Sequence, residues 1–138
     1  MPYDPDNIFA KILRGEIPCF KIFEDEHTLS FLDIMPATQG HTLVIPKEPG
    51  ETLFDISPTA AAATIKTTQI VASAVKRAFD APGIMLVQLN GKAAGQSVPH
   101  LHFHILPRFH GIDMNLHGRE MADISNLEPI AEKIRCEI

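Results

Sequence analysis

The 138-residue sequence contains no tryptophan, only two cysteines, and no apolar run that approaches the length of a membrane span. Because a helix needs about 20 apolar residues to cross a bilayer, we expect no membrane partner. Cys19 and Cys136 cannot form a disulfide framework, and such sparse use is typical of a reducing compartment. The first six residues are acidic and proline-rich, unlike a signal peptide. These absences predict a cytoplasmic protein.

Positive charge is also sparse. The chain has 12 lysines and arginines against 17 aspartates and glutamates, a net charge of −5 with neutral histidine, and the basic residues form no run. Proteins that bind nucleic acid generally present a basic face to the phosphates, so we expect no nucleic-acid partner. Hydrophobic content of 45% and charged content of 21% are ordinary for a folded domain. The length predicts a single domain over 1–138, with 1–6 as a loose N-terminal arm.

The local patterns predict an α+β fold. Asn7 can cap a short helix that stops before Gly15, and Ser57 followed by Pro58 can open a long helix. The expected elements are a helix at 8–14, strands at 20–23, 28–32 and 41–45, a helix at 58–79, strands at 84–89 and 100–106, and a helix at 126–135. Because strands follow one another through tight turns, we expect an antiparallel sheet of about five strands with one long helix and shorter terminal helices.

Histidine is abundant, with seven residues, and three of them are evenly spaced. His100, His102 and His104 alternate with apolar residues, so on a strand the three imidazoles share one face and the apolar side chains the other. A solvated strand face normally carries Thr, Lys or Glu, and adjacent imidazoles repel one another when protonated. The spacing therefore predicts a functional site. The histidines interpreted as ordinary surface or core residues are His27, His110 and His117.

Two kinds of chemistry fit the evenly spaced histidines. Imidazole is a common zinc ligand, but at about 3.3 Å per residue His100 and His104 would lie about 13 Å apart on a strand, too far to converge easily on one ion. Two of the histidines could still chelate an ion with help from elsewhere. Phosphate chemistry is the alternative, because loop 90–97 supplies two glycines, a lysine, an amide and a hydroxyl that could surround an anion.

Segment 95–106, Gly-Gln-Ser-Val-Pro-His-Leu-His-Phe-His-Ile-Leu, resembles the His-x-His-x-His signature of the histidine-triad (HIT) family, in which x is apolar. Segments 8–12, 15–18, 31–36 and 40–47 resemble further parts of the family pattern in order. The similarity is greatest to the Hint-like branch. It implies a homodimer, without a cofactor, that hydrolyses purine nucleoside phosphoramidates or related monophosphate derivatives through a nucleotidyl-histidine intermediate. The alternatives are a dinucleoside polyphosphate hydrolase of the Fhit kind, a nucleotide-binding adaptor without significant turnover, and a zinc-binding protein.

The resemblance also implies roles for individual residues. His102 corresponds to the family's nucleophile, with one ring nitrogen held by the backbone carbonyl of His100. His104 corresponds to a ligand of a phosphate oxygen, Ser97 lies where the family has a hydroxyl near the leaving group, and His41 matches a fourth histidine that supports the triad. The loop residues expected to contact the phosphate, chiefly through backbone N–H groups, are Gly95, Gln96, Ser97 and Val98.

The nucleoside end of the site is assigned by the same resemblance. Asp33 matches the acid that accepts hydrogen bonds from the ribose hydroxyls, a role that suits a carboxylate because it offers only acceptors. Some of the apolar positions could equally be apolar only to fill a core. The residues that match the family's base-binding positions are Ile8, Phe9, Ile12, Phe31, Ile34 and Leu43.

Three features depart from the family pattern. In some members two cysteines, a histidine and the first triad histidine bind zinc, whereas Asn7, Ala10 and Pro49 occupy the first three of these positions here. This predicts no structural metal site. Leu89 stands where the family usually has Asn or Gln in contact with the phosphate. The C-terminal tail also lacks the tryptophan that many Hint proteins send toward the partner's site, so the leaving-group specificity does not carry over.

Overall fold

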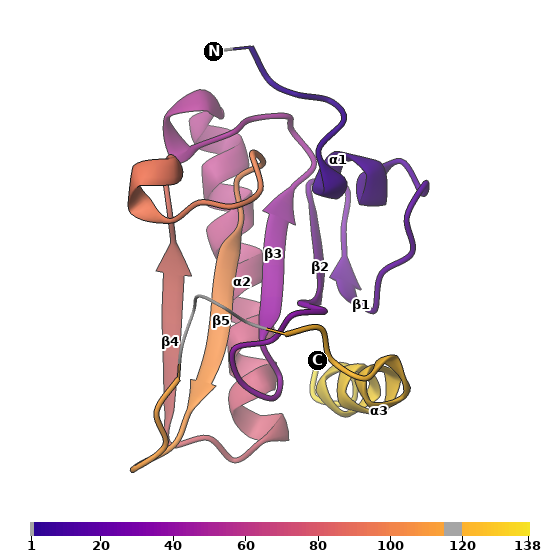
Figure 1. Ribbon diagram of the computed structural model, residues 1–138, viewed down its shortest axis with the longest axis vertical. Coiled ribbons are helices and arrows are strands. Elements are labelled where there is room, and N and C mark those ends of the chain that lie inside the picture. The colour runs from indigo at the N-terminus through magenta and orange to yellow at the C-terminus, as the bar shows by residue number, and fades with distance from the viewer. Residues whose placement is uncertain (1, 115–119) are drawn as a thin grey trace.

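A five-stranded antiparallel sheet organises the fold (Figure 1). The computed structural model describes residues 2–114 and 120–138. The strands are β1 (Lys21–Glu24), β2 (Thr28–Leu32), β3 (Thr42–Pro46), β4 (Gly83–Gln88) and β5 (Phe103–Arg108), in the spatial order β1-β2-β3-β5-β4. Each neighbouring pair of strands is antiparallel. The predicted α+β class, with an antiparallel sheet and one long helix, is therefore confirmed.

Two helices share an apolar core with one face of this sheet. The long helix α2 (Pro58–Ala78) begins where the Ser57 hydroxyl accepts a hydrogen bond from the Ala60 N–H, with Pro58 in the first turn. The second helix, α3 (Ile124–Arg135), packs against α2 and β1. The buried residues of this core are Ile22, Leu32, Val44, Val71, Ala74, Val75, Ala78, Ile105, Leu127, Ala131 and Ile134.

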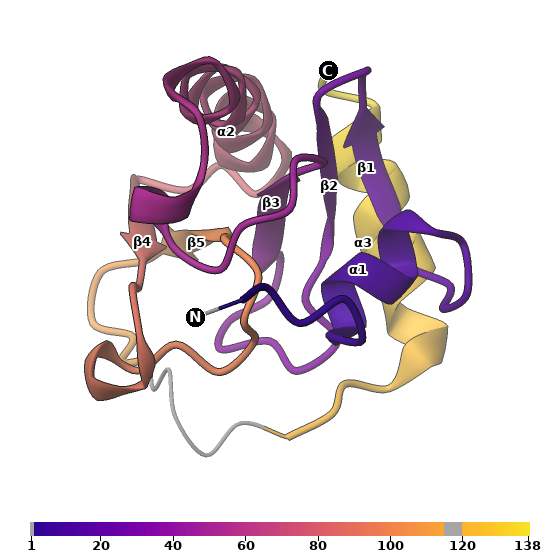
Figure 2. The same cartoon turned by 90° about the horizontal axis from the view of Figure 1, so that it is seen from above.

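The short helix α1 (Ile8–Leu13) lies on the opposite side of the sheet from α2, as Figure 2 shows. Asn7 caps α1 by accepting the Ala10 N–H at 2.9 Å, as the sequence predicted. Gly15 follows the helix with φ +78°, a left-handed conformation that lets the chain turn back toward β1. A second, smaller apolar cluster forms under α1 from Phe9, Leu29, Phe31, Leu43 and Ile45.

The histidine segment differs from the predicted strand at 100–106. β5 begins only at Phe103, because the preceding backbone turns toward other partners. The His100 N–H donates to the Val98 carbonyl and the Leu101 N–H to the Gly50 carbonyl, both at 2.9 Å. His104 alone of the three histidines lies within the strand, opposite Leu43 on β3.

Other elements extend or shift the predicted ones. α3 begins at Ile124, two residues earlier than expected, because Asp123 caps it by accepting the Ser125 N–H. Two short 3₁₀ helices, Leu53–Asp55 and Lys92–Ala94, add to the predicted elements. None of the helices within 2–114 and 120–138 is long and apolar enough to span a membrane. His117, interpreted as an ordinary residue, lies outside the described residues.

Candidate active site

An apolar cleft of about 180 Å³ opens on the α1 side of the sheet. Its polar lining comes from Asp33, Ser97, His102 and His104, and apart from the Cys19 thiol the remaining side chains are apolar. The full lining is Ile8, Phe9, Ile12, Ile17, Pro18, Cys19, Phe31, Leu32, Asp33, Ile34, Met35, Leu43, Ser97, Val98, His102 and His104. The cleft thus contains all six predicted base-binding residues together with two of the three evenly spaced histidines.

A larger hollow of about 540 Å³ lies on the other side of Asp33, between the segment at 36–41 and α3. Its lining includes His41 but neither His102 nor His104. The smaller cleft is the better candidate for a reaction centre, because only it exposes the histidine pair together with an extended apolar wall.

His102 is held in one tautomer. Its Nδ1 lies 2.7 Å from the backbone carbonyl oxygen of His100. A carbonyl can only accept a hydrogen bond, so Nδ1 carries the proton and, in the neutral ring, Nε2 carries the lone pair. The Phe9 ring packs edge-to-face on this imidazole with centroids 5.0 Å apart, which limits its rotation. The result is a nearly buried imidazole whose basic nitrogen is chosen by the backbone.

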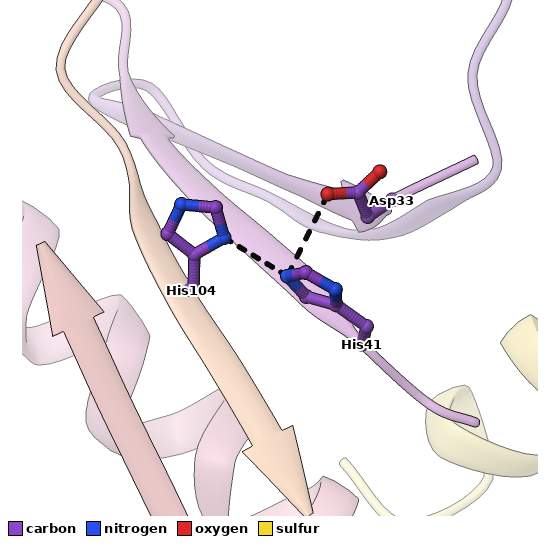
Figure 3. Close-up of side chains that lie close together, drawn as sticks. All are labelled: Asp33, His41 and His104. Atoms are coloured by element: carbon purple, nitrogen blue, oxygen red, sulfur yellow. Dashed lines mark hydrogen bonds and ion pairs between the residues drawn. The ribbon is translucent and has the colours of Figure 1, made fainter. Parts of the chain in front are cut away.

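His104 is oriented by a chain of hydrogen bonds that starts from a backbone N–H and passes through His41, whose bond to His104 is drawn in Figure 3. The Ala37 N–H donates to His41 Nδ1 at 3.0 Å, so the proton of the neutral His41 ring resides on Nε2. His41 Nε2 donates to His104 Nδ1 at 2.9 Å. His104 therefore carries its own proton on Nε2. The protonated Nε2 of His104 is a hydrogen-bond donor and can therefore bind a negatively charged oxygen.

Asp33 joins this cluster from the end of β2. One carboxylate oxygen accepts the Met35 N–H at 2.8 Å, and the other lies 3.6 Å from His41 Nε2. The Asp33 N–H also donates to the His41 carbonyl at 3.0 Å, so the two residues face each other across a backbone contact. Asp33 consequently presents a fixed acceptor at the border of the cleft.

Asp33, His41 and His104 have the spacing of a metal site, with ligand atoms within 4.8 Å of one another. The hydrogen-bond directions do not fit a metal, however. A metal on His41 Nε2 would require that nitrogen to lose its proton, while the Ala37 N–H already points at Nδ1 and leaves no room for the proton there. The cluster is better suited to orienting His104: the backbone N–H of Ala37 fixes the tautomer of His41, and His41 in turn fixes which nitrogen of His104 accepts a hydrogen bond.

The first triad histidine, His100, lies behind the cleft and is fully buried. Its Nε2 donates to the Pro46 carbonyl at 2.9 Å, and burial lowers its pKa to about 4. His100 is therefore neutral near pH 7. Its contribution to the cleft is the backbone carbonyl that holds His102.

Loop 90–98 differs from the predicted phosphate cradle at two residues. The Gly95 N–H donates to the Lys92 carbonyl and the Gln96 N–H to the Gly91 carbonyl, so both are used within the loop. The Gln96 side chain is buried, accepts the Gly91 N–H and donates to the carbonyls of Glu51 and Val98. It braces the loop and does not line the cleft. Ser97 and Val98 are the two predicted loop residues that reach it.

Sequence reasoning did not identify five lining residues, Ile17, Pro18, Cys19, Leu32 and Met35. Leu32 is the last residue of β2, and the other four lie in irregular connections beside α1 and β2, where no periodicity marks an inward-facing side chain. Burial raises the pKa of the Cys19 thiol, so Cys19 lines the cleft as a neutral group. The Ala37 amide was also unpredictable, because its role depends on backbone direction alone.

Comparison with known proteins places these features in a family. Residues 14–111 match the HIT domain. The chain is 44% identical to a Hit-like protein of Bartonella henselae whose crystal structure superimposes with a TM-score of 0.93, over 99% of this chain and 100% of that one. Adenosine 5'-monophosphoramidase hnt1 of Schizosaccharomyces pombe is 40% identical over 101 residues, 73% of each protein. Adenylylsulfatase HINT3 of Arabidopsis thaliana is 41% identical over 103 residues, which are 75% of this chain and 52% of that protein. The chain belongs to the histidine-triad family, in its Hint-like branch.

Proposed function

We propose that this protein is a nucleotide hydrolase that cleaves purine nucleoside phosphoramidates and related monophosphate derivatives. The observation that carries the proposal is the tautomer of His102, whose Nδ1 donates to the His100 carbonyl while the ring lines a cleft with an apolar wall. This arrangement leaves the nucleophilic lone pair on Nε2. The relatives described as an adenosine monophosphoramidase and an adenylylsulfatase support the same substrate class.

The proposed reaction has two displacements at the α-phosphorus. In the first, His102 Nε2 forms a bond to phosphorus as the bond to the leaving nitrogen or oxygen breaks, and the leaving group takes the electron pair of that bond and a proton from solvent. In the second, water attacks the same phosphorus and loses a proton to solvent, the electron pair of the breaking bond returns to Nε2, and nucleoside monophosphate is released. Dividing one displacement into two lowers each barrier. The His100 carbonyl stabilises the cationic imidazole that forms during the first step.

The remaining polar groups of the cleft fit the charge that develops on the phosphate. The His104 Nε2–H would donate to a non-bridging oxygen, and because His104 is oriented through His41, this donor is in place before the substrate binds. Ser97 is exposed at the border of the cleft, and its hydroxyl would donate a hydrogen bond near the leaving group. These donors take the place of basic side chains, since the cleft lining includes no lysine or arginine among the described residues.

The nucleoside would occupy the other part of the cleft. Asp33 would accept hydrogen bonds from the ribose hydroxyls, while Phe9, Phe31 and Leu43 would contact the base. An apolar wall recognises a base by shape and stacking and offers few groups that read its edges. We therefore expect modest discrimination among purines.

We also propose that the protein is a homodimer that pairs through β4. This strand lies at the edge of the sheet, and its Met85 and Leu86 side chains are 42% and 52% exposed. An edge strand with exposed apolar side chains is a favourable surface for a second copy. Light scattering on the purified protein tests the proposal, and a monomeric mass would contradict it.

The activity is tested by comparing wild type with His102→Ala on adenosine phosphoramidate. We expect turnover to fall by roughly 10³-fold or more, because the residual rate of an enzyme without its nucleophile comes only from binding and charge stabilisation. Intact-mass analysis after brief exposure to substrate should detect a nucleotide adduct on the wild type but not on the variant. His27→Ala is the matched control, since this histidine lies on the surface beside Glu26.

Three outcomes would contradict parts of the proposal. Full turnover by His102→Ala would exclude His102 as the nucleophile. Binding of purine monophosphates without turnover of any ester or amide would favour an adaptor. Faster hydrolysis of diadenosine polyphosphate than of phosphoramidate would assign the Fhit-like activity instead.

A further inference from the structure

The N-terminal segment, predicted as a loose arm at 1–6, is attached to the histidine segment over its described residues. It crosses the end of the sheet where β5 begins and leads into α1 (Figure 2). The Arg14 guanidinium donates to the Pro5 carbonyl at 2.8 Å, and the Asn7 N–H donates to the Asp4 carbonyl at 3.4 Å. These contacts bring Tyr3 against His100, 97 residues away in sequence.

The Tyr3 hydroxyl lies 2.6 Å from His100 Nδ1, and its direction follows from its neighbours. His100 Nε2 must carry the proton, because its partner is the Pro46 carbonyl. Nδ1 is then an acceptor, so the Tyr3 hydroxyl donates to it. The two rings also meet edge-to-face with centroids 5.7 Å apart.

Asn7 supplies the hydrogen bond that the Tyr3 hydroxyl oxygen accepts. Its amide oxygen accepts the Ala10 N–H, which turns the amide nitrogen toward Tyr3. That nitrogen donates to the Tyr3 oxygen at 2.9 Å. All the bonds therefore run in one direction, from Asn7 through Tyr3 and His100 to Pro46. One hydroxyl joins the start of α1, which carries part of the apolar wall, to the residue whose carbonyl holds His102.

We propose that Tyr3 is a positioning residue for His102, acting through the His100 imidazole and backbone. This inference rests on the proposed function for its kinetic consequence, but its structural part does not depend on catalysis. With the Tyr3 bond in place, both ring nitrogens of a fully buried imidazole are satisfied and the ring has one allowed orientation. The His100 carbonyl is then fixed where it accepts the His102 Nδ1 proton.

Loss of the Tyr3 hydroxyl leaves a buried acceptor without its donor, a state that proteins avoid by moving the group or admitting water. Either response shifts the backbone at His100 and weakens the bond that selects the His102 tautomer. The wrong tautomer places a proton on Nε2 and cannot attack phosphorus. The nucleoside contacts remain, because Tyr3 does not line the cleft.

Two variants isolate this effect. Tyr3→Phe removes the hydroxyl and keeps the ring. Asn7→Asp keeps Tyr3 and the helix cap, since aspartate caps helices about as well as asparagine, although it removes the amide donor to the Asp4 carbonyl as well as the donor to Tyr3. Its carboxylate accepts the Tyr3 hydroxyl proton, however, and so withdraws it from His100. Arg14→Gln is the matched control, because it loosens the same segment at Pro5 without changing the chain from Asn7 to Pro46.

The first measurement reads the histidine tautomers by ¹⁵N NMR of histidine-labelled protein and needs no substrate. We expect His102 to be protonated at Nδ1 in the wild type and in Arg14→Gln, with a mixture of tautomers in Tyr3→Phe and Asn7→Asp. The second measurement is the single-turnover rate of adduct formation on His102. It should fall about tenfold in both test variants, as misplacement of a reacting group typically costs that much or more. Affinity for adenosine monophosphate should change less than twofold.

An unchanged His102 tautomer in both Tyr3→Phe and Asn7→Asp would overturn the proposal, even if these variants melt at lower temperature. An altered tautomer with an unchanged adduct rate would also overturn it, because positioning would then have no consequence. If the wild type forms no adduct with any substrate, the proposed function fails, while the NMR comparison still decides whether Tyr3 orients the histidines.

Discussion

The two faces of the sheet are built on different physical principles, although the same strands supply both. On β5, Ile105 is fully buried in the core under α2 and α3, whereas the adjacent His104 joins the cluster on the α1 side. Apolar packing on the first face is non-directional and depends on area and shape. Hydrogen bonds on the second face are directional, and each direction is set by a backbone N–H, which can only donate, or a backbone carbonyl, which can only accept.

The directed hydrogen bonds explain how the polar histidine cluster can be buried without leaving unpaired donors or acceptors. The structure assigns a partner to each buried side-chain nitrogen and oxygen of the described residues. Backbone groups of Ala37, Pro46 and His100 define the directions. The core face should therefore determine stability, and the histidine face should determine which nitrogen reacts. Three predictions test this division.

The largest effect is expected from Ile134→Ala, which truncates a fully buried side chain that α3 contributes to the core on the first face of the sheet. Truncating a buried isoleucine lowers the free energy of unfolding by roughly 2–5 kcal/mol, because the transfer free energy of the deleted atoms is lost and a cavity is left in the core. Urea unfolding should show this loss, while turnover per folded molecule stays near that of the wild type. A large fall in turnover with intact folding would show that the two faces are coupled.

The next effect concerns pH and His100. Burial lowers its pKa in the folded protein to about 4, below the ordinary value of 6.5. The unfolded chain therefore binds more protons between these values, and the free energy of unfolding should decrease by up to about 3 kcal/mol as the pH falls from 6.5 to 4. Urea unfolding at pH 7 and 4.5 measures this loss. In His100→Gln the free energy of unfolding should change less between these two pH values than it does in the wild type. An equal change in both proteins would mean that other groups cause the pH dependence.

The smallest effect is expected from paired substitutions of His41. His41→Asn keeps an acceptor for the Ala37 N–H but is too short to donate to His104, so turnover should fall roughly tenfold to a hundredfold as a phosphate donor loses its orientation. His41→Gln reaches His104 and should retain several-fold more activity than His41→Asn. Steady-state kinetics compare the two variants. Equal activities would mean that the bond to His104 does not matter.

Much of the fold could be predicted from local patterns. Asn7 and Ser57 cap the helices that they were expected to cap, because capping needs only neighbouring N–H groups. Alternation of apolar residues located the strands, with errors of one or two residues at most ends. The start of β5 was missed by three residues, since its pairing competes with bonds from Leu101 to Gly50.

The candidate site was predictable in its residue types and less so in its connections. All six apolar positions and Asp33 reach the cleft, as the family resemblance implied. Gln96 turns inward instead, because its amide has three backbone partners that only the folded loop brings together. Tyr3 was placed in a loose arm because no local signal links it to a histidine 97 residues away.

The amino acids alone were enough to predict the order of the α-helices and strands, the family, and the set of histidines available for chemistry. These depend on side-chain type and spacing, which are local properties. Which nitrogen of each imidazole carries a proton was set by the folded arrangement. That choice depends on whether a carbonyl or an N–H from a distant segment faces the ring, and hydrogen-bond direction exists only once those segments meet.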